Sequence, residues 1–455
     1  MAYPETVKYL ESFINYEKIP AYPYKESLKL ERIEEFLESI GNPQDALKCI
    51  HVAGTKGKGS TCAFISYILR QAGYRVGLYT SPHLSDFRER IRILAQQSDT
   101  LTNQAKCEFE GIISESELAQ LLEILKPKIE DYNKNSEYGQ LSFFEVYTSL
   151  AFVYFKEKKV DFAVLETGLG GRLDATNVVN PYVCAITPLS YEHTQKLGNT
   201  LREIAAEKAG IIKAQSVKCK AQNLIVISAP QEKEAIEVIR NKCKKVDARL
   251  YEVERDITYQ KTNNGFNIKG IFGEYPNLEI RLLGDHQLIN AAVAIGAVEA
   301  LRFYNININI NAIRVGLYDT LWPGRCEIIS RNPLLVLDGA QNVASTLALR
   351  QAIKANFKYK KLILVLGVSC DKDIKGICKE LYDLLDTVIL TRANNSRAAE
   401  PERLAEYFKA KETYITNNVE EAVTYAQRIA RKEDLILVCG SLFVVGEFRN
   451  VFQYV

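Results

Sequence analysis

The feature that most constrains the fold of this chain is a glycine-rich run that joins an apolar segment to a helical pattern. The run is Gly54-Thr55-Lys56-Gly57-Lys58-Gly59-Ser60; the apolar segment Cys49–Ala53 precedes it and the helical pattern Thr61–Gln71 follows it. Glycines let successive backbone N–H groups approach an anion closely, and a helix N-terminus adds the positive end of its dipole. The run therefore predicts a strand, a phosphate-binding turn and a helix.

The run differs from the usual P-loop pattern at two positions. Val52 stands where the first glycine belongs, and Gly59 separates Lys58 from the hydroxyl of Ser60. Lys58 is predicted to reach the outer phosphates, and the hydroxyl of Ser60 or Thr61 to meet Mg²⁺. The alternative is a flexible glycine-lysine loop, which the flanking strand and helix patterns disfavour.

Composition indicates a globular protein of more than one domain. The chain has 455 residues, of which 47% are hydrophobic and 25% charged, with a net charge of +2. Such a balance predicts neither a nucleic-acid nor a membrane partner. The 10 cysteines stand singly, as in a reduced, cytoplasmic protein. The segment Met1–Leu10 lacks an apolar core, so we expect no secretory signal, and no uncharged apolar run approaches membrane-spanning length.

Short β-rich runs alternate with helical patterns along the chain, which predicts an α/β fold with parallel sheets. A strong breaker, Leu321-Trp322-Pro323-Gly324-Arg325, precedes a second strand–helix series and marks the predicted domain boundary. Two segments stand apart: Ala95–Phe109 is predicted to be a loop insertion, and Glu252–Arg281 a small antiparallel hairpin unit around Asn263-Asn264-Gly265. The predicted strands are Cys49–Ala53, Arg75–Tyr79, Asp161–Glu166, Tyr182–Thr187, Leu224–Ser228, Leu334–Leu337, Lys361–Leu366, Thr387–Thr391 and Leu435–Cys439. The predicted helices include Phe143–Glu157, Thr200–Lys213, Asn290–Arg302 and Ser345–Ala355.

Polar residues follow several predicted strands, at the edge where open α/β sheets bind ligands. Ser81, in Thr80–Leu84, offers a hydroxyl to Mg²⁺, although a Ser-Pro turn is the better interpretation of that residue alone. Glu145 begins an apolar helix, where a carboxylate is either paired, bound to a metal, or simply favoured by the helix dipole. The spacing does not favour a paired or metal-bound carboxylate over a first-turn glutamate stabilised by the helix dipole, or the reverse.

The run Glu166–Asn177 follows a strongly apolar strand and supplies backbone donors, a guanidinium and a carboxylate in one turn. His193 lies after another predicted strand, where imidazole is a natural metal ligand and an exposed loop histidine is the ordinary alternative. Lys208, taken alone, is typical of a surface helix. In the second half, Arg325 and Asp338 could close over a triphosphate and its ribose.

Together these residues resemble one family, the folylpolyglutamate synthases and bifunctional dihydrofolate synthases of the Mur ligase superfamily. The matching segments occur in the family's order over nearly the whole chain. They are Gly54–Ser60, Thr80–Leu84, Glu89–Ile91, Phe143–Glu145, Glu166–Asn177, His193-Thr194 with Leu197-Gly198, Glu207–Ile212, Gly284–Asn290, Trp322–Arg325, Asp338–Asn342 and Asp371–Asp373.

The resemblance implies a P-loop NTPase-like parallel-sheet domain of the Mur ligase central type at residues 1–321. It implies a smaller, Rossmann-like glutamate-ligase domain at 322–455. The implied activity is ATP-dependent, ADP-forming addition of L-glutamate to a folate, to dihydropteroate, or to both, through an acyl phosphate. We expect a cytoplasmic monomer.

The resemblance also implies the site residues. Its ATP-binding set is Gly54, Thr55, Gly57, Lys58, Gly59, Ser60, Asn290, Arg325 and Asp338. Two Mg²⁺ ions are expected on Ser81, Glu145, His193 and a carbamate of Lys208, and the catalytic set is Lys58, Lys208 and His193. Carbamylation requires a neutral amine, so the pKa of Lys208 should be lowered.

The chain departs from the family pattern at Glu192, where aspartate is common, and at Gln341, where histidine is common. Gln341 cannot titrate, which argues against proton transfer there. Pro188 and the insertion Ala95–Phe109 are also unusual. Two alternatives stay open: another Mur-type ligase acting on a cell-wall precursor, and a non-catalytic nucleotide-binding protein. The first is disfavoured by Lys58-Gly59-Ser60, where cell-wall members carry Lys-Thr, and the second by the intact Lys58, Glu145, His193 and Lys208.

Overall fold

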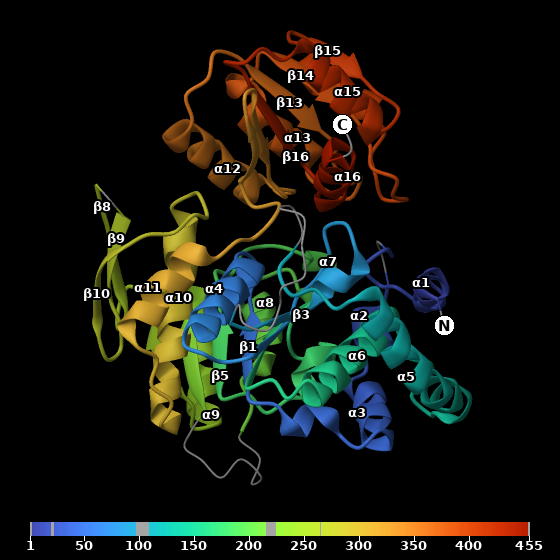
Figure 1. The fold of residues 1–455 in the computed structure, drawn as a ribbon, viewed down its shortest axis with the longest axis vertical. Helices are drawn as coiled ribbons and strands as arrows, with labels where there is room; N and C mark the ends of the chain where they lie inside the picture. The colour runs from blue at the N-terminus through green and yellow to red at the C-terminus, as the bar shows by residue number, and fades with distance from the viewer. Residues whose placement is uncertain (1, 20–21, 97–108, 215–223, 264, 454–455) are drawn as a thin grey trace. The chain divides into compact units, whose positions relative to one another are not determined.

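The computed structural model describes residues 2–19, 22–96, 109–214, 224–263 and 265–453 (Figure 1). The chain divides into two compact units. The first comprises Met1–His83, Phe87–Arg281 and Gln287–Thr320, and the second comprises Leu84–Asp86, Leu282–His286 and Leu321–Val455. No helix in the described ranges is both long enough and apolar enough to cross a membrane.

A seven-stranded sheet forms the centre of the first unit, in the order β3-β2-β4-β1-β5-β6-β7. All neighbours are parallel except β2 and β3, which are antiparallel. The central strands are buried along their whole length, which explains their continuous apolar runs. The strands are β1 (Cys49–Ala53), β2 (Val76–Tyr79), β3 (Ile91–Leu94), β4 (Phe162–Glu166), β5 (Val183–Ile186), β6 (Ile225–Ser228) and β7 (Arg249–Glu252).

Helices cover this sheet, and α4 lies beside α11 (Figure 1). Gly316 of α11 permits that approach, because a Cβ atom there would lie 2.5 Å from the Cα of Ile68 on α4. The helices of this unit are α1 (Tyr3–Glu11), α2 (Tyr24–Ser27), α3 (Leu30–Ser39), α4 (Lys58–Gln71), α5 (Glu115–Asn135), α6 (Phe143–Glu157), α7 (Thr194–Leu197), α8 (Leu201–Lys208), α9 (Lys233–Lys245), α10 (His286–Ala300) and α11 (Ile310–Asp319).

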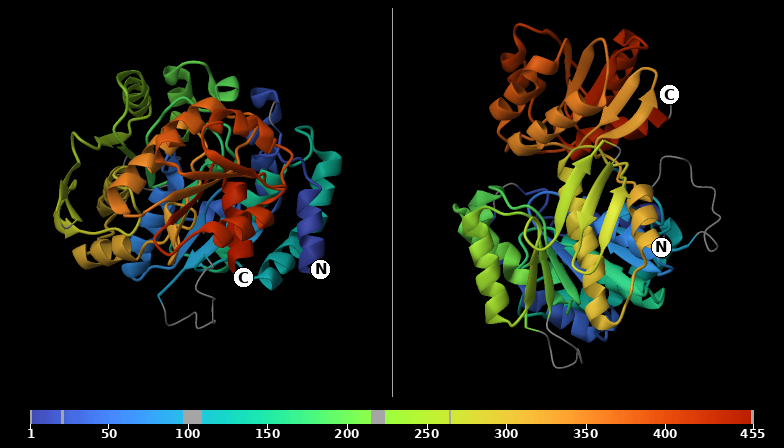
Figure 2. Two further views of the ribbon diagram at one scale, coloured as in Figure 1. Left: turned by 90° about the horizontal axis from the view of Figure 1, so that it is seen from above. Right: turned by 90° about the vertical axis from the view of Figure 1, so that its left-hand side faces the viewer.

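The predicted hairpin unit is a separate three-stranded antiparallel sheet, which faces the viewer in the right-hand panel of Figure 2. Its strands are β8 (Thr258–Thr262), β9 (Gly265–Lys269) and β10 (Glu274–Leu278), and Asn264 of the predicted turn lies outside the described residues. Glu299 of α10 anchors the sheet, since its carboxylate accepts the N–H groups of Ile271 and Phe272 at 2.6 and 3.0 Å.

The second unit is built on a six-stranded sheet in the order β11-β12-β16-β13-β14-β15. Only β11 and β12 pair in antiparallel fashion. Its strands are β11 (Glu327–Arg331), β12 (Leu334–Leu337), β13 (Leu362–Leu366), β14 (Thr387–Leu390), β15 (Glu412–Ile415) and β16 (Leu435–Cys439). Its helices are α12 (Val343–Asn356), α13 (Ile374–Leu381), α14 (Pro401–Ala405), α15 (Val419–Ile429) and α16 (Leu442–Gln453). The α/β fold class with two mainly parallel sheets is confirmed.

Sequence patterns placed the buried strands well and the edges poorly. The strand Cys49–Ala53 and the helix Phe143–Glu157 have the predicted bounds. The helix predicted at Thr200–Lys213 ends at Lys208 and continues as a single 3₁₀ turn. The edge strands β3, β7, β11 and β15 were not predicted, because each carries at least one charged residue that interrupts its apolar pattern. Most of the predicted insertion Ala95–Phe109 lies outside the described residues.

Candidate active site

The glycine-rich run forms the turn between β1 and α4. Gly57, with a φ of 81°, precedes the helix, and a Cβ atom there would lie 2.2 Å from Oδ1 of Asn290. Gly54, with a φ of 153°, is equally confined, since its Cβ atom would lie 1.8 Å from Oγ1 of Thr187. Both positions therefore require glycine, for backbone conformation and for space. The same contact brings Asn290, on α10, to the run.

The backbone N–H groups of the run divide into two sets. Those of Thr55 and Lys56 donate to the carbonyl oxygen of Pro188, at 3.1 and 3.2 Å. The first helical bond of α4 is made by Thr61 N–H to the oxygen of Gly57, at 2.9 Å. The N–H groups of the residues between, 58–60, have no acceptor within the helix. The second set is thus available to an anion at the positive end of the helix dipole.

A carboxylate, a hydroxyl-bearing residue and an ammonium group meet beside this turn. Glu166, the last residue of β4, is only 5% exposed. Its Oε2 accepts the N–H of Ser81, just after β2, at 3.1 Å, and its Oε1 lies 3.8 Å from Nζ of Lys58. Strands β2, β4 and β1 are neighbours, so their carboxyl ends bring these three residues together. Glu166 was not among the predicted site residues; the available signal was a charged residue that ends an apolar strand.

Lys208, the last residue of α8, lies against the start of the glycine-rich run. It is 4% exposed, and its Nζ donates to the carbonyl oxygen of Gly54 at 2.8 Å. Burial lowers the pKa of Lys208 to about 7, helped by Lys58 and Lys56 and opposed by Glu192. A substantial fraction of the amine is therefore neutral near pH 7, and the neutral amine is the state that a carbamate requires.

The turn after Glu166 fixes the end of α8. Asp174 holds this turn, because its Oδ2 accepts the N–H groups of Gly168 and Leu169 at 2.8 and 2.9 Å. The backbone N–H of Arg172 then donates to the oxygen of Glu207 at 2.8 Å. The glycine run at 168–171 thus supports the helix end that carries Lys208. The glycine run itself is followed by a short 3₁₀ turn, Ala175–Val178.

His193 lies in the segment that leaves β5. It is exposed, it has a φ of 52°, and its carbonyl oxygen accepts the N–H groups of Lys196 and Leu197 at the start of α7. Its neighbour Glu192 is paired with Lys56 of the glycine-rich run, at 3.3 Å. This pair ties the segment that carries His193 to the phosphate turn.

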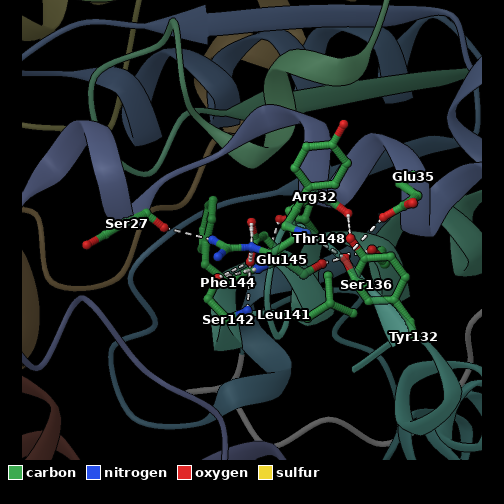
Figure 3. Close-up of polar contacts among 12 residues, drawn as sticks. Ser27, Arg32, Glu35, Tyr132, Ser136, Leu141, Ser142, Phe144, Glu145 and Thr148 are labelled. Atoms are coloured by element: carbon green, nitrogen blue, oxygen red, sulfur yellow. Dashed lines mark hydrogen bonds and ion pairs between the residues drawn. The ribbon is translucent and has the colours of Figure 1, made fainter. Parts of the chain in front are cut away.

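The carboxylate of Glu145 is bound by Arg32 and Ser142 (Figure 3). Its carboxylate accepts Nε of Arg32 at 2.8 and 3.0 Å, and Oε2 also accepts the backbone N–H and the hydroxyl of Ser142, at 2.7 and 2.6 Å. Burial raises the pKa of Glu145, although Arg32 and Ser142 oppose the rise. These contacts form a helix-capping box with an added ion pair. The Glu145 carboxylate is thus paired with Arg32 and caps the start of α6.

The donors beside the phosphate turn do fit Mg²⁺. This ion prefers oxygen ligands, retains several waters, and is commonly held by one or two carboxylates plus substrate phosphates. Glu166 and Ser81 supply such oxygens next to the predicted phosphate position. No cluster of three or more His, Cys, Asp and Glu side chains able to hold a metal occurs in the described part of the chain.

Arg325 and Asp338 belong to the second unit. The two oxygens of Asp338, at the end of β12, accept the N–H groups of Cys326 and Ala340, each at 2.8 Å. Burial raises the pKa of Asp338 and the nearby Arg325 opposes that rise. Gly339 gives the guanidinium room, since a Cβ atom there would lie 2.4 Å from an Arg325 nitrogen. The structure brings these two residues together, but it does not relate them to the phosphate turn.

A phosphate turn in a mainly parallel sheet, followed by a second α/β unit, is the arrangement of a Mur-type ligase, and both units match Mur ligase families. Residues 52–298 match the Mur ligase middle domain, and residues 324–442 match the family described as Mur ligase, glutamate ligase domain. The chain is 33% identical to a dihydrofolate synthase/folylpolyglutamate synthase of Bacillus subtilis, over 92% of this chain and 94% of that protein. The chain belongs to the folylpolyglutamate synthase/dihydrofolate synthase family of Mur ligases.

Solved structures of related proteins have the same fold as this chain. The folylpolyglutamate synthase of Mycobacterium tuberculosis complexed with ADP superimposes with a TM-score of 0.86 at 28% identity, covering 99% of this chain and 98% of that one. The FolC protein of E. coli, in complex with DHPP and ADP, gives a TM-score of 0.81 at 28% identity, covering 100% of this chain and 98% of that one.

Proposed function

We propose that this chain is an ATP-dependent, ADP-forming ligase that adds L-glutamate to a folate and also to dihydropteroate. The observation that carries this proposal is the phosphate turn, with N–H donors at residues 58–60, Lys58, Glu166 and the buried Lys208 around it. The related Bacillus subtilis protein is named for both activities, and the E. coli relative was solved with DHPP and ADP.

The chemistry needs positioning and charge stabilisation more than a covalent nucleophile. An oxygen of the substrate carboxylate attacks the γ-phosphorus of ATP, the bond to the bridging oxygen breaks, and ADP leaves. Lys58 and the N–H groups at the start of α4 offset the charge on the transferred group. The amino nitrogen of glutamate then attacks the acyl phosphate carbon, loses a proton, and expels phosphate.

We propose that Ser81 and Glu166 hold one Mg²⁺, and that His193 and a carbamate on Lys208 hold a second. When bound, Mg²⁺ offsets negative charge on the phosphates. Glu166 replaces Glu145 in the set inferred from the sequence, because Arg32 and Ser142 already satisfy the Glu145 carboxylate. Lys208 as a protonated ammonium would repel a cation, whereas its carbamate would supply anionic oxygens.

Further assignments remain proposals that rest on the family resemblance. Residues 1–321 would bind ATP and residues 322–455 would serve glutamate ligation, with Asn290, Arg325 and Asp338 contacting the nucleotide. Asn290 has the support of its contact with Gly57. We also propose that the protein is a cytoplasmic monomer.

The test is phosphate release by the purified protein with ATP, Mg²⁺, L-glutamate and either dihydropteroate or a reduced folate, assayed side by side. We expect release with both acceptors, and none from the Lys58→Ala variant. Activity only on a muramyl precursor would overturn the folate assignment. Nucleotide binding without turnover on any acceptor would favour a non-catalytic protein.

A further inference from the structure

The segment that leaves β5 supports the first half of the phosphate turn. The carbonyl oxygen of Pro188 accepts the N–H groups of both Thr55 and Lys56, at 3.1 and 3.2 Å. Two further bonds join Thr55 to Ser190: the N–H of Ser190 donates to Oγ1 of Thr55 at 3.1 Å, and that hydroxyl donates to the Ser190 carbonyl at 3.3 Å. These bonds tie the first half of the turn to the segment, and those of Thr55 and Lys56 to Pro188 depend on the direction of the Pro188 carbonyl.

One side chain fixes that direction. Gln231, just after the neighbouring strand β6, donates from Nε2 to the carbonyl oxygen of Thr187 at 3.1 Å. Its Oε1 accepts the N–H of Leu189 at 2.9 Å. The two bonds bracket Pro188, which has no N–H of its own to be satisfied. Ser228 completes the contact by accepting from the same Nε2 at 3.4 Å.

We propose that Gln231 is a positioning residue for the nucleotide: its amide clamps the Thr187–Leu189 turn and thereby holds the phosphate turn in its binding shape. Gln231 does not itself belong to the set of groups expected to contact ATP. The inference rests on the proposed nucleotide site at Gly54–Ser60.

The expected effect follows from preorganisation. If the clamp is lost, the Pro188 carbonyl can rotate, and the N–H groups of Thr55 and Lys56 lose their shared acceptor. The turn then has to be ordered when the nucleotide binds, and that cost appears as weaker binding. Saturating ATP restores the same bound state, so KM for ATP should rise while kcat changes little.

The test compares Gln231→Met with Gln71→Met. Gln71 ends α4, the helix that begins at the phosphate turn, and its amide donates to Asp319 at 2.9 Å, so the control removes a glutamine amide bond from the same helix at its far end. Affinity for ADP is measured by calorimetry, with melting temperature and KM values for ATP and the folate. Loss of about one net hydrogen bond corresponds to roughly tenfold weaker ADP binding for Gln231→Met, with wild-type affinity for Gln71→Met.

Wild-type ADP affinity in folded Gln231→Met would overturn the inference, as would an equal loss in Gln71→Met or an equal loss of folate affinity. If Gln231→Met does not fold, Gln231→Glu serves, since it keeps the acceptor for Leu189 and removes the donor to Thr187. This variant should also bind ADP more weakly with an unchanged KM for the folate, and unchanged ADP binding would count against the clamp. Failure of the unmodified protein to bind ADP would instead refute the proposed function.

Discussion

At the scale of single residues, Lys208 is the most informative side chain. It is buried, it bonds to the carbonyl of Gly54, and its pKa is lowered to about 7. An amine with this pKa is protonated below pH 7 and neutral above it. Incorporation of ¹³C-labelled CO₂ into protein stripped of carbamate should therefore rise through about pH 7, and not near the ordinary lysine value of 10.5; carbon NMR measures it. An uptake that rises only above pH 9 would contradict this expectation.

The proposed carbamate can be tested by substitution. Lys208→Ala should abolish phosphate release while ADP binding survives, and short carboxylic acids should restore part of the activity by filling the vacated anionic position. Lys58→Ala is the matched control: it removes a cation from the same site, so short acids should not rescue it. Equal rescue of both variants would argue against a carbamate.

Substitution of Glu166 should lower activity, whereas substitution of Glu145 should lower stability. Glu166→Gln removes the carboxylate beside Ser81 and Lys58, so kcat should fall by about 100-fold or more with little change in melting temperature. Glu145→Gln leaves Arg32 buried and without its anion, so the free energy of unfolding should fall by about 3 kcal/mol, measured by urea denaturation. The folded fraction of Glu145→Gln should keep normal kcat and Mg²⁺ dependence. A normal stability with lost Mg²⁺ dependence would restore Glu145 as a ligand.

At the scale of elements, the β1–α4 turn depends on glycine for two separable reasons. Gly57 and Gly41 have φ values of 81° and 82°, but an added Cβ atom meets Asn290 at Gly57 and nothing within 4 Å at Gly41. Both alanine variants should lose about 1 kcal/mol of stability from backbone strain. Only Gly57→Ala should weaken ADP binding, by about tenfold, because it displaces Asn290. Calorimetry on both variants distinguishes strain from site disruption.

The elements that sequence patterns predicted well are those with a strong local signal. Buried strands such as Cys49–Ala53 are uniformly apolar, and the capping box at Thr200 and Glu203 is present as expected. Edge strands such as Glu412–Ile415 are partly exposed and carry charge, so they resemble loops until a neighbouring strand pairs with them.

At the scale of the whole molecule, we expect the second unit to contribute to nucleotide binding through Arg325. ADP at about 100 times its Kd should stabilise the protein by about 2.7 kcal/mol, seen as a higher melting temperature. If Arg325 contacts the nucleotide, Arg325→Ala should reduce this shift, while Arg331→Ala, at an exposed position of the same unit, should not. An identical shift in all three proteins would confine nucleotide binding to the first unit.

The amino-acid sequence by itself determined the phosphate turn, the alternation of strands and helices, and the family, because each depends on residues that are close together along the chain. Tertiary structure decided which carboxylate lies beside the phosphate turn. Glu145 pairs with Arg32, 113 positions away, and Glu166 accepts a hydrogen bond from Ser81, 85 positions away. It also placed Lys208 against Gly54, across 154 positions. Burial and charge at these residues come from partners that lie far away in the sequence, and only the folded chain brings them into contact.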